Sequence, residues 1–125
     1  MMTVLMISLG AAIGANLRYG LSFWAAQQWG STFPYGTLLV NILGSFCIGM
    51  LLEYIGIYPG LIEWRAPLVT GLLGSLTTFS TFSFETYQLV IQGSWFWAGL
   101  NIVGSIVLGL CAVFLGVGLV RLIVL

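Results

Sequence analysis

Long apolar runs, separated by short groups of turn residues, dominate the pattern of this sequence. A helix rises about 1.5 Å per residue, so about 20 mostly apolar residues are needed to cross the hydrocarbon core of a bilayer. Four stretches of this length are present, and each break between them carries Gly, Pro or charged residues. The pattern predicts one all-α membrane domain over residues 1–125, with four transmembrane helices at about 3–29, 36–54, 67–92 and 95–122.

The three breaks between these helices differ in their chemistry. Residues 30–34 and 92–94 are short and rich in Gly and Ser, whereas residues 55–66 contain Pro59-Gly60, Glu63 and Arg65 and are expected to form an exposed loop. Trp and Tyr prefer the headgroup level of a membrane. One such group, near the first and third breaks, holds Trp24, Trp29, Tyr35, Trp95 and Trp97, and the other holds Tyr54, Tyr58 and Trp64.

Composition leaves the bilayer as the only plausible solvent. Hydrophobic residues make up 60% of the 125, charged residues only 5%, and the mean hydropathy is +1.12. Three arginines face three glutamates, with no Lys and no His, which excludes a basic surface for nucleic acid. An enzyme is also not expected, because no nucleophile has an evident base.

The few cations give almost no preference for one membrane orientation. With four spans, Arg65 and Arg121 fall on the side of the N-terminus, and Arg18 lies toward the opposite end of the first helix. Such a chain is able to insert either way up, which suggests an antiparallel homodimer of oppositely inserted copies. Four packed helices also fill their own centre with side chains, so a transport pathway would need a second copy.

Polar residues within the spans are the candidates for function, because charged groups there cost roughly 2.5 to 3.5 kcal/mol. Gly10, Gly14, Arg18 and Ser22 recur every four residues on one helix face. Arg18 either extends to the headgroups or supplies a positive field at a water-filled vestibule.

Two further spans carry an amide. Asn41 shares a face with Thr37 and Ser45, and its NH2 group either links helices or offers neutral donors to an anion. Asn101, Ser105 and Gly109 repeat the spacing in the last span, where helix packing is favoured.

The third span has the densest polar pattern. Seven of the eleven residues from Ser75 to Glu85 are Ser, Thr or Glu. Hydroxyls that bend back onto preceding carbonyls weaken a helix, so we expect a break at about 74–80. Freed carbonyls there would either coordinate a cation or belong to a simple kink. Phe79 and Phe82 lie three residues apart and either contact lipid or present positive ring edges to a small anion.

These segments resemble the bacterial Fluc/CrcB fluoride channels along the whole chain. The similar segments are Gly10 to Tyr19 (GAAIGANLRY), Gly36 to Gly49 (GTLLVNILGSFCIG), Gly71 to Phe82 (GLLGSLTTFSTF) and Asn101 to Gly109 (NIVGSIVLG). Where the family often has two adjacent glycines in its third helix, this chain has Gly74-Ser75. The resemblance implies a dual-topology dimer in the bacterial inner membrane whose two antiparallel pores passively export fluoride and so give fluoride resistance.

The resemblance also implies roles for individual residues. Asn41, Phe79 and Phe82 would contact fluoride in the pores, and Arg18 would lie near the vestibule. A structural sodium ion at the dimer centre would be held by backbone carbonyls of Gly74 and Thr77 from both subunits. The hydroxyl-rich track beside the pore contacts would include Ser80, Thr81, Ser83 and Glu85.

Two other classes of membrane protein compete with a fluoride channel. A small multidrug-resistance-type proton-coupled antiporter also has four helices, but it needs a titratable carboxylate facing its substrate cavity, commonly in the first helix. Here that helix holds Arg18, and the only deeply placed carboxylate is Glu85. A non-transporting assembly subunit would explain the helices but not the hydroxyl-rich third span.

Overall fold

A computed structural model describes all 125 residues, which form an all-helical chain. Three helices are long and apolar enough to cross a membrane: α1 (Met2–Trp29), α2 (Tyr35–Ile57) and α5 (Trp95–Val124). The segment between α2 and α5 is divided into shorter pieces. These are a 3-10 helix η1 (Pro59–Trp64), a π-helix η2 (Ala66–Leu73), the short α3 (Gly74–Leu76) and α4 (Phe79–Ile91).

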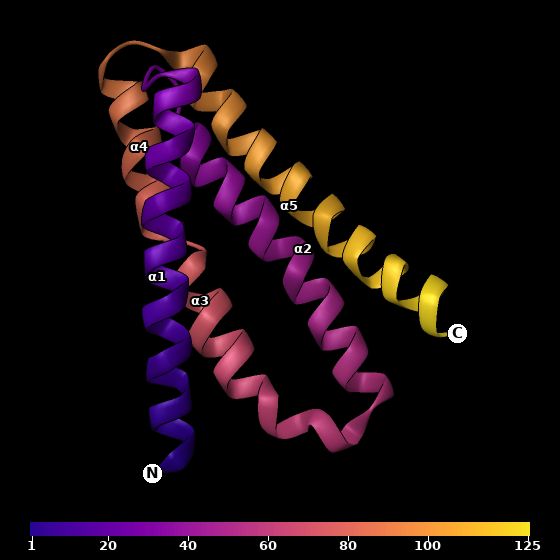
Figure 1. The fold of residues 1–125 in the computed structure, drawn as a ribbon. Helices are drawn as coiled ribbons and strands as arrows, with labels where there is room; N and C mark the ends of the chain where they lie inside the picture. The colour runs from indigo at the N-terminus through magenta and orange to yellow at the C-terminus, as the bar shows by residue number, and fades with distance from the viewer.

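The helices alternate in direction between two ends of the molecule. Residues 30–34 and 92–94 turn the chain at the top of Figure 1, and η1 and the N-terminus lie toward the other end. Helix α2 packs along α5, whereas α1 packs along η2 and α3. The α4 helix packs against α5 and does not share the contacts that η2 and α3 make with α1. The two halves of the third span therefore have different main partners, α1 for η2 and α3 and α5 for α4, whereas α2 contacts both halves.

Small residues bring α1 close to the third span. A Cβ added at Gly10 would lie 2.5 Å from the carbonyl oxygen of Pro67, and one at Gly14 would collide with the carbonyl oxygen of Leu72. Gly71 makes the reciprocal approach to Ile7. Backbones approach this closely in membranes only where side chains are absent or small. The expected close-packing role of Gly10 and Gly14 is confirmed.

The connection between the second and third spans is more helical than a loop. Helix α2 runs to Ile57, three residues beyond the expected end at 54, and η1 occupies much of the expected loop 55–66. Pro59 suits the first helical position because its ring fixes φ and it needs no amide partner there. None of the η1 residues is buried, so the expected exposure is confirmed for η1, although Ile55 at the start of the expected loop is buried at the end of α2. The backbone of this connection is mostly helical rather than a loop.

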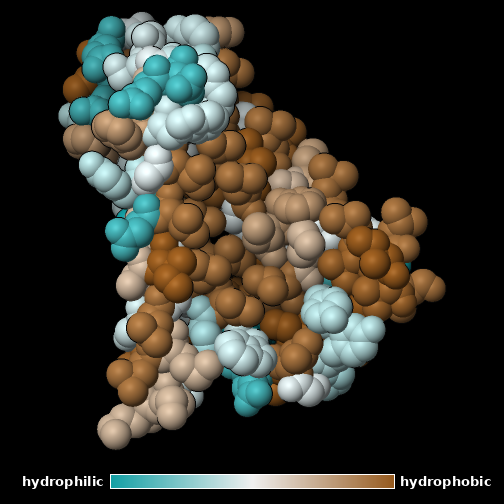
Figure 2. Space-filling view, viewed as in Figure 1, coloured by the Kyte–Doolittle hydropathy of each residue, from teal (hydrophilic) through white to brown (hydrophobic).

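Most of the outer surface is apolar, as a lipid environment requires. Figure 2 shows hydrophobic residues over the middle of the visible face, with hydrophilic ones gathered toward the ends. At one end the rings of Trp24 and Trp29 lie 5.3 Å apart, and at the other those of Tyr54 and Tyr58 lie 4.9 Å apart. The aromatic residues thus mark both expected headgroup levels.

Candidate functional site

The third span is interrupted at Thr77 and Thr78, whose backbone is extended between α3 and α4. Asn41 of α2 holds this interruption. Its Nδ2 donates to the Thr78 carbonyl oxygen at 3.1 Å, and the Thr78 amide donates to its Oδ1 at 2.8 Å. One side-chain amide therefore satisfies both polar groups of one residue, as a neighbouring strand would. Such pairing is needed at membrane depth, where unsatisfied backbone groups are costly.

Thr78 also begins α4. Its Oγ1 accepts a hydrogen bond from the Thr81 amide at 3.2 Å, which is an N-cap, and donates to Thr81 Oγ1 at 3.0 Å. Ser80 Oγ lies 3.3 Å from the same hydroxyl. On the other side of the interruption, Thr77 Oγ1 donates to the Leu73 carbonyl at 2.9 Å. The hydroxyls near the interruption thus serve mainly to end one helix and start the next.

The side-chain bonds at the interruption replace two helical hydrogen bonds. In a continuous α-helix the amide of Thr78 would donate to Gly74 and that of Thr81 to Thr77. Here those amides donate to Asn41 and to the Thr78 hydroxyl instead. The carbonyls of Gly74 and Thr77, the pair that the resemblance assigns to a cation, are therefore among those that lose their helical donors.

A groove of about 370 Å³ opens beside the interruption, between α2, α4, α5 and the η2–α3 segment. We call it the break groove. The Phe79 and Phe82 rings lie in it with centroids 5.6 Å apart and planes tilted by 40°. Phe79 is 78% exposed, and Phe82 is half-buried. The residues that line the break groove include Asn41, Gly44, Gly74, Thr77, Phe79, Phe82 and Ser105.

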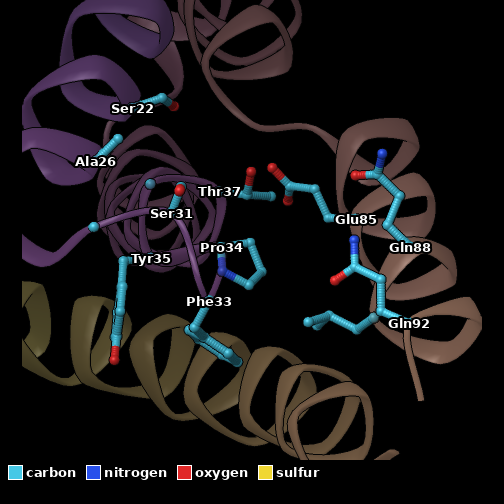
Figure 3. Close-up of a pocket in the computed structure, with 13 residues that line it drawn as sticks. Ser22, Ala26, Ser31, Phe33, Pro34, Tyr35, Thr37, Glu85, Gln88 and Gln92 are labelled. Carbon is cyan, nitrogen blue, oxygen red and sulfur yellow. The ribbon is translucent and has the colours of Figure 1, made fainter. Parts of the chain in front are cut away.

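Glu85 lies on another side of α4, in a separate cavity of about 220 Å³ that we call the Glu85 cavity. Six residues after Phe79 correspond to about 600° of helix, which turns Glu85 to a different face. Figure 3 shows the Glu85 carboxyl and the Thr37 hydroxyl pointing toward one another, with Gln88 and Gln92 beside them. Glu85 Oε2 is buried and has no hydrogen-bond partner.

Four other candidates, Ser80 among them, do not line the break groove. Ser83 is exposed and its Oγ donates to the Phe79 carbonyl at 2.9 Å, so its hydroxyl is used within α4. The Thr81 hydroxyl is similarly engaged by Thr78. Arg18 is half-buried on α1 and lines neither the break groove nor the Glu85 cavity.

Helix α5 contributes residues in two ways. Asn101 is 1% exposed and donates to Thr86 Oγ1 at 2.9 Å, while Thr86 Oγ1 donates to the Phe82 carbonyl at 2.8 Å. The expected packing role of Asn101 is confirmed. Ser105, for which packing was favoured, lines the break groove with a buried, unpartnered Oγ. Its position four residues after Asn101, on the same helix face, is the signal for this placement.

The geometry thus defines an all-helical membrane protein with three membrane-length apolar helices. The segment between α2 and α5 is interrupted where the Asn41 amide pairs with Thr78. Residues 5–117 match the family model described as CrcB-like protein, Camphor Resistance (CrcB), and the chain belongs to this family.

Curated relatives match almost end to end. The protein named "Fluoride-specific ion channel FluC" from Roseiflexus sp. (strain RS-1) is 56% identical over 121 residues, covering 96% of this chain and 98% of the relative. The protein of the same name from Chloroflexus aurantiacus (strain ATCC 29366 / DSM 635 / J-10-fl) is 54% identical, covering 97% of each chain. That from Shewanella amazonensis (strain ATCC BAA-1098 / SB2B) is 50% identical, covering 93% and 94%.

Proposed function

We propose that this chain is a fluoride channel, which passively exports fluoride across the bacterial inner membrane. The single observation that carries the proposal is the break groove, where two phenylalanine rings, an asparagine amide and an unpartnered serine hydroxyl meet beside an interrupted helix. The printed names of relatives at 50–56% identity support the same ion.

The groups in the break groove suit a small, strongly hydrated anion. A route for fluoride must replace its water with several donors, yet a deep guanidinium or ammonium would bind the ion too tightly to release it. Asn41 uses one of its two amide hydrogens on Thr78, which leaves one free for an anion. The Ser105 hydroxyl and the positive edges of the Phe79 and Phe82 rings add neutral contacts.

The other candidates would extend this route. The Glu85 cavity is lined partly by residues 30 and 31 of the first turn, so it connects the third span to one aqueous face. Ser80, Thr81, Ser83 and Glu85 would form the polar track toward that face. Arg18 would act from a vestibule, where its charge attracts anions without contacting them in the pore.

The functional unit would be an antiparallel dual-topology homodimer with two pores. Phe79 is 78% exposed in one subunit, although a pore contact should be enclosed. A second copy packed over the break groove would enclose it. One subunit therefore supplies only part of the wall around the proposed path.

The residues at the interruption fit a structural sodium ion at the dimer interface. Sodium prefers oxygen ligands, and unwound helices commonly supply backbone carbonyls for it. Gly74 and Thr77 both line the break groove, and both lose their helical donors. Carbonyls from two copies would complete the ligand set. The ion would tie the two interrupted helices together and would take no part in fluoride binding.

Efflux from proteoliposomes tests the proposed function. Without a proton gradient, liposomes containing the protein should release fluoride faster than protein-free liposomes prepared in the same way. Equal rates would contradict a channel. Release that requires a proton gradient would instead support the multidrug-resistance-type antiporter, with Glu85 as its titratable group.

Gly44→Ala should disturb the proposed ion sites through Thr77. An added Cβ would collide with the Thr77 methyl group, and Thr77 is tied to Leu73 by its hydroxyl. Overpacking of this kind costs about 1–3 kcal/mol. We expect a lower melting temperature and about tenfold slower fluoride efflux. Gly99→Ala is the matched control because a Cβ there meets nothing within 4 Å. Equal melting temperatures and equal fluoride efflux for the two variants would show that the position of Thr77 does not affect the proposed path.

A further inference from the structure

A second groove, of about 380 Å³, lies on the surface where α2 meets η1, at the end of the molecule away from the Glu85 cavity. We call it the Arg65 groove. Its lining consists of Leu52, Ile55, Gly56, Pro59, Ile62 and Arg65, so Arg65 is the only polar side chain in it. The volume is within the range of small-molecule sites, about 300–1,000 Å³. The groove thus combines an apolar floor with one cation.

The charge of Arg65 has no counterion in the chain. The only ion pair joins Glu53 to Arg121, with Oε1 and Nε 2.7 Å apart. Glu63 is two residues from Arg65 and exposed, and side chains two apart on a helix do not face one another. Arg65 is itself exposed. An external anion would therefore meet an uncompensated guanidinium.

The position of the Arg65 groove indicates which anion would be available. Tyr54, Tyr58 and Trp64 surround this end and are each between 42% and 45% exposed. Such aromatic residues lie at the headgroup level of a membrane. At that level the phosphate of a lipid lies directly above its acyl chains. Arg65 can therefore meet the phosphate while the apolar residues of the groove meet an acyl chain.

We propose that the Arg65 groove binds one anionic glycerophospholipid, with its phosphate at Arg65 and an acyl chain along Leu52, Ile55 and Ile62. Guanidinium groups bind phosphate through paired hydrogen bonds. A zwitterionic lipid would fit less well because it carries its own cation beside Arg65. This proposal does not depend on fluoride transport.

Gly56 provides a way to close the groove. A Cβ added at Gly56 would meet nothing within 4 Å, so a larger side chain has space to enter the groove without moving the backbone. Gly56→Leu should therefore occupy the place of the acyl chain. Gly99→Leu is the matched control, because Gly99 also has open space around it but lies on α5 outside the groove.

Native mass spectrometry of the purified full chain, with equimolar phosphatidylglycerol and phosphatidylcholine, tests the site. The wild type should retain phosphatidylglycerol preferentially. Arg65→Gln should reduce that preference about fivefold, because one basic residue contributes about 1 kcal/mol to anionic-lipid binding. Gly56→Leu should reduce retention at least as much. Gly99→Leu and Arg18→Gln should keep most of the preference.

Trp64 offers a second measurement that does not depend on groove variants folding normally. It is the only one of the five tryptophans near the Arg65 groove. In a variant whose other tryptophans are Phe, brominated phosphatidylglycerol should quench Trp64 more strongly than brominated phosphatidylcholine. The proposal would be overturned by equal quenching of Trp64 by the two brominated lipids. It would also be overturned if Arg65→Gln and Gly56→Leu kept the wild-type lipid preference, or if Arg18→Gln lost as much of that preference as Arg65→Gln.

Discussion

Asn41→Leu should reduce fluoride efflux by about 100-fold or more and destabilise the protein. The substitution removes both hydrogen bonds to Thr78, at 2.8 and 3.1 Å, while keeping a similar side-chain volume. Each buried polar group left without a partner costs about 1–3 kcal/mol. The backbone at the interruption would then have to rearrange, and the free Asn41 amide hydrogen proposed for fluoride would also be lost.

Two measurements report the two expected effects of Asn41→Leu, on the fluoride path and on the backbone at the interruption. Efflux reports the pathway, and hydrogen exchange at the Thr78 amide reports whether the interruption is still held. Both should change together. Asn16→Leu is the matched control, because Asn16 is exposed and donates only to Ala12 in its own helix. If Asn41→Leu leaves efflux at the wild-type rate, Asn41 neither holds nor lines a fluoride path.

Phe82→Ile should slow fluoride efflux at least about tenfold, which corresponds to about 1.4 kcal/mol in the barrier. Isoleucine keeps an apolar side chain at this half-buried position but has no ring edge to offer an anion. The hydrogen bond from Thr86 to the Phe82 carbonyl involves only the backbone of residue 82 and should survive. Efflux should therefore fall while the proposed dimer remains intact on size-exclusion chromatography.

Phe84→Ile is the control for loss of an aromatic ring from the same helix. Phe84 is 60% exposed, lies next to Tyr87 at 6.3 Å, and is not among the residues that line the break groove. We expect its efflux to match the wild type. If Phe82→Ile and Phe84→Ile give the same efflux as the unmodified protein, the Phe82 ring has no part in the pathway.

The sequence was sufficient to predict the three long apolar helices and the segment that holds the candidate site. The apolar runs of α1, α2 and α5 are recognisable because a helix that crosses a bilayer needs a fixed length of apolar residues. Turn residues mark their ends because irregular backbone is not tolerated in contact with lipid. The hydroxyl-rich stretch after Ser75 drew attention to the segment that contains Thr77 and Thr78. These signals are local, so a single sequence reveals them directly.

Contacts between residues far apart in the sequence could not be predicted, because the sequence signals are local. The partner of the Thr78 amide is Asn41, 37 residues earlier, and no local pattern encodes that pairing. The partner of Glu85 is equally remote in sequence, because its carboxyl lies in a cavity with Thr37, 48 residues earlier, apart from the groove of Phe79 and Phe82. The π-helix η2 could not be predicted either, because its composition is that of an ordinary apolar helix.

The most direct test compares fluoride with chloride efflux from the same proteoliposomes containing the unmodified protein. Neutral donors and ring edges enclosed between two copies should favour the smaller ion, so fluoride should leave at least about 100-fold faster, a difference of about 2.7 kcal/mol in barrier. Equal rates for the two halides would contradict the view that the groove beside Asn41 and the two phenylalanines is a fluoride-selective path.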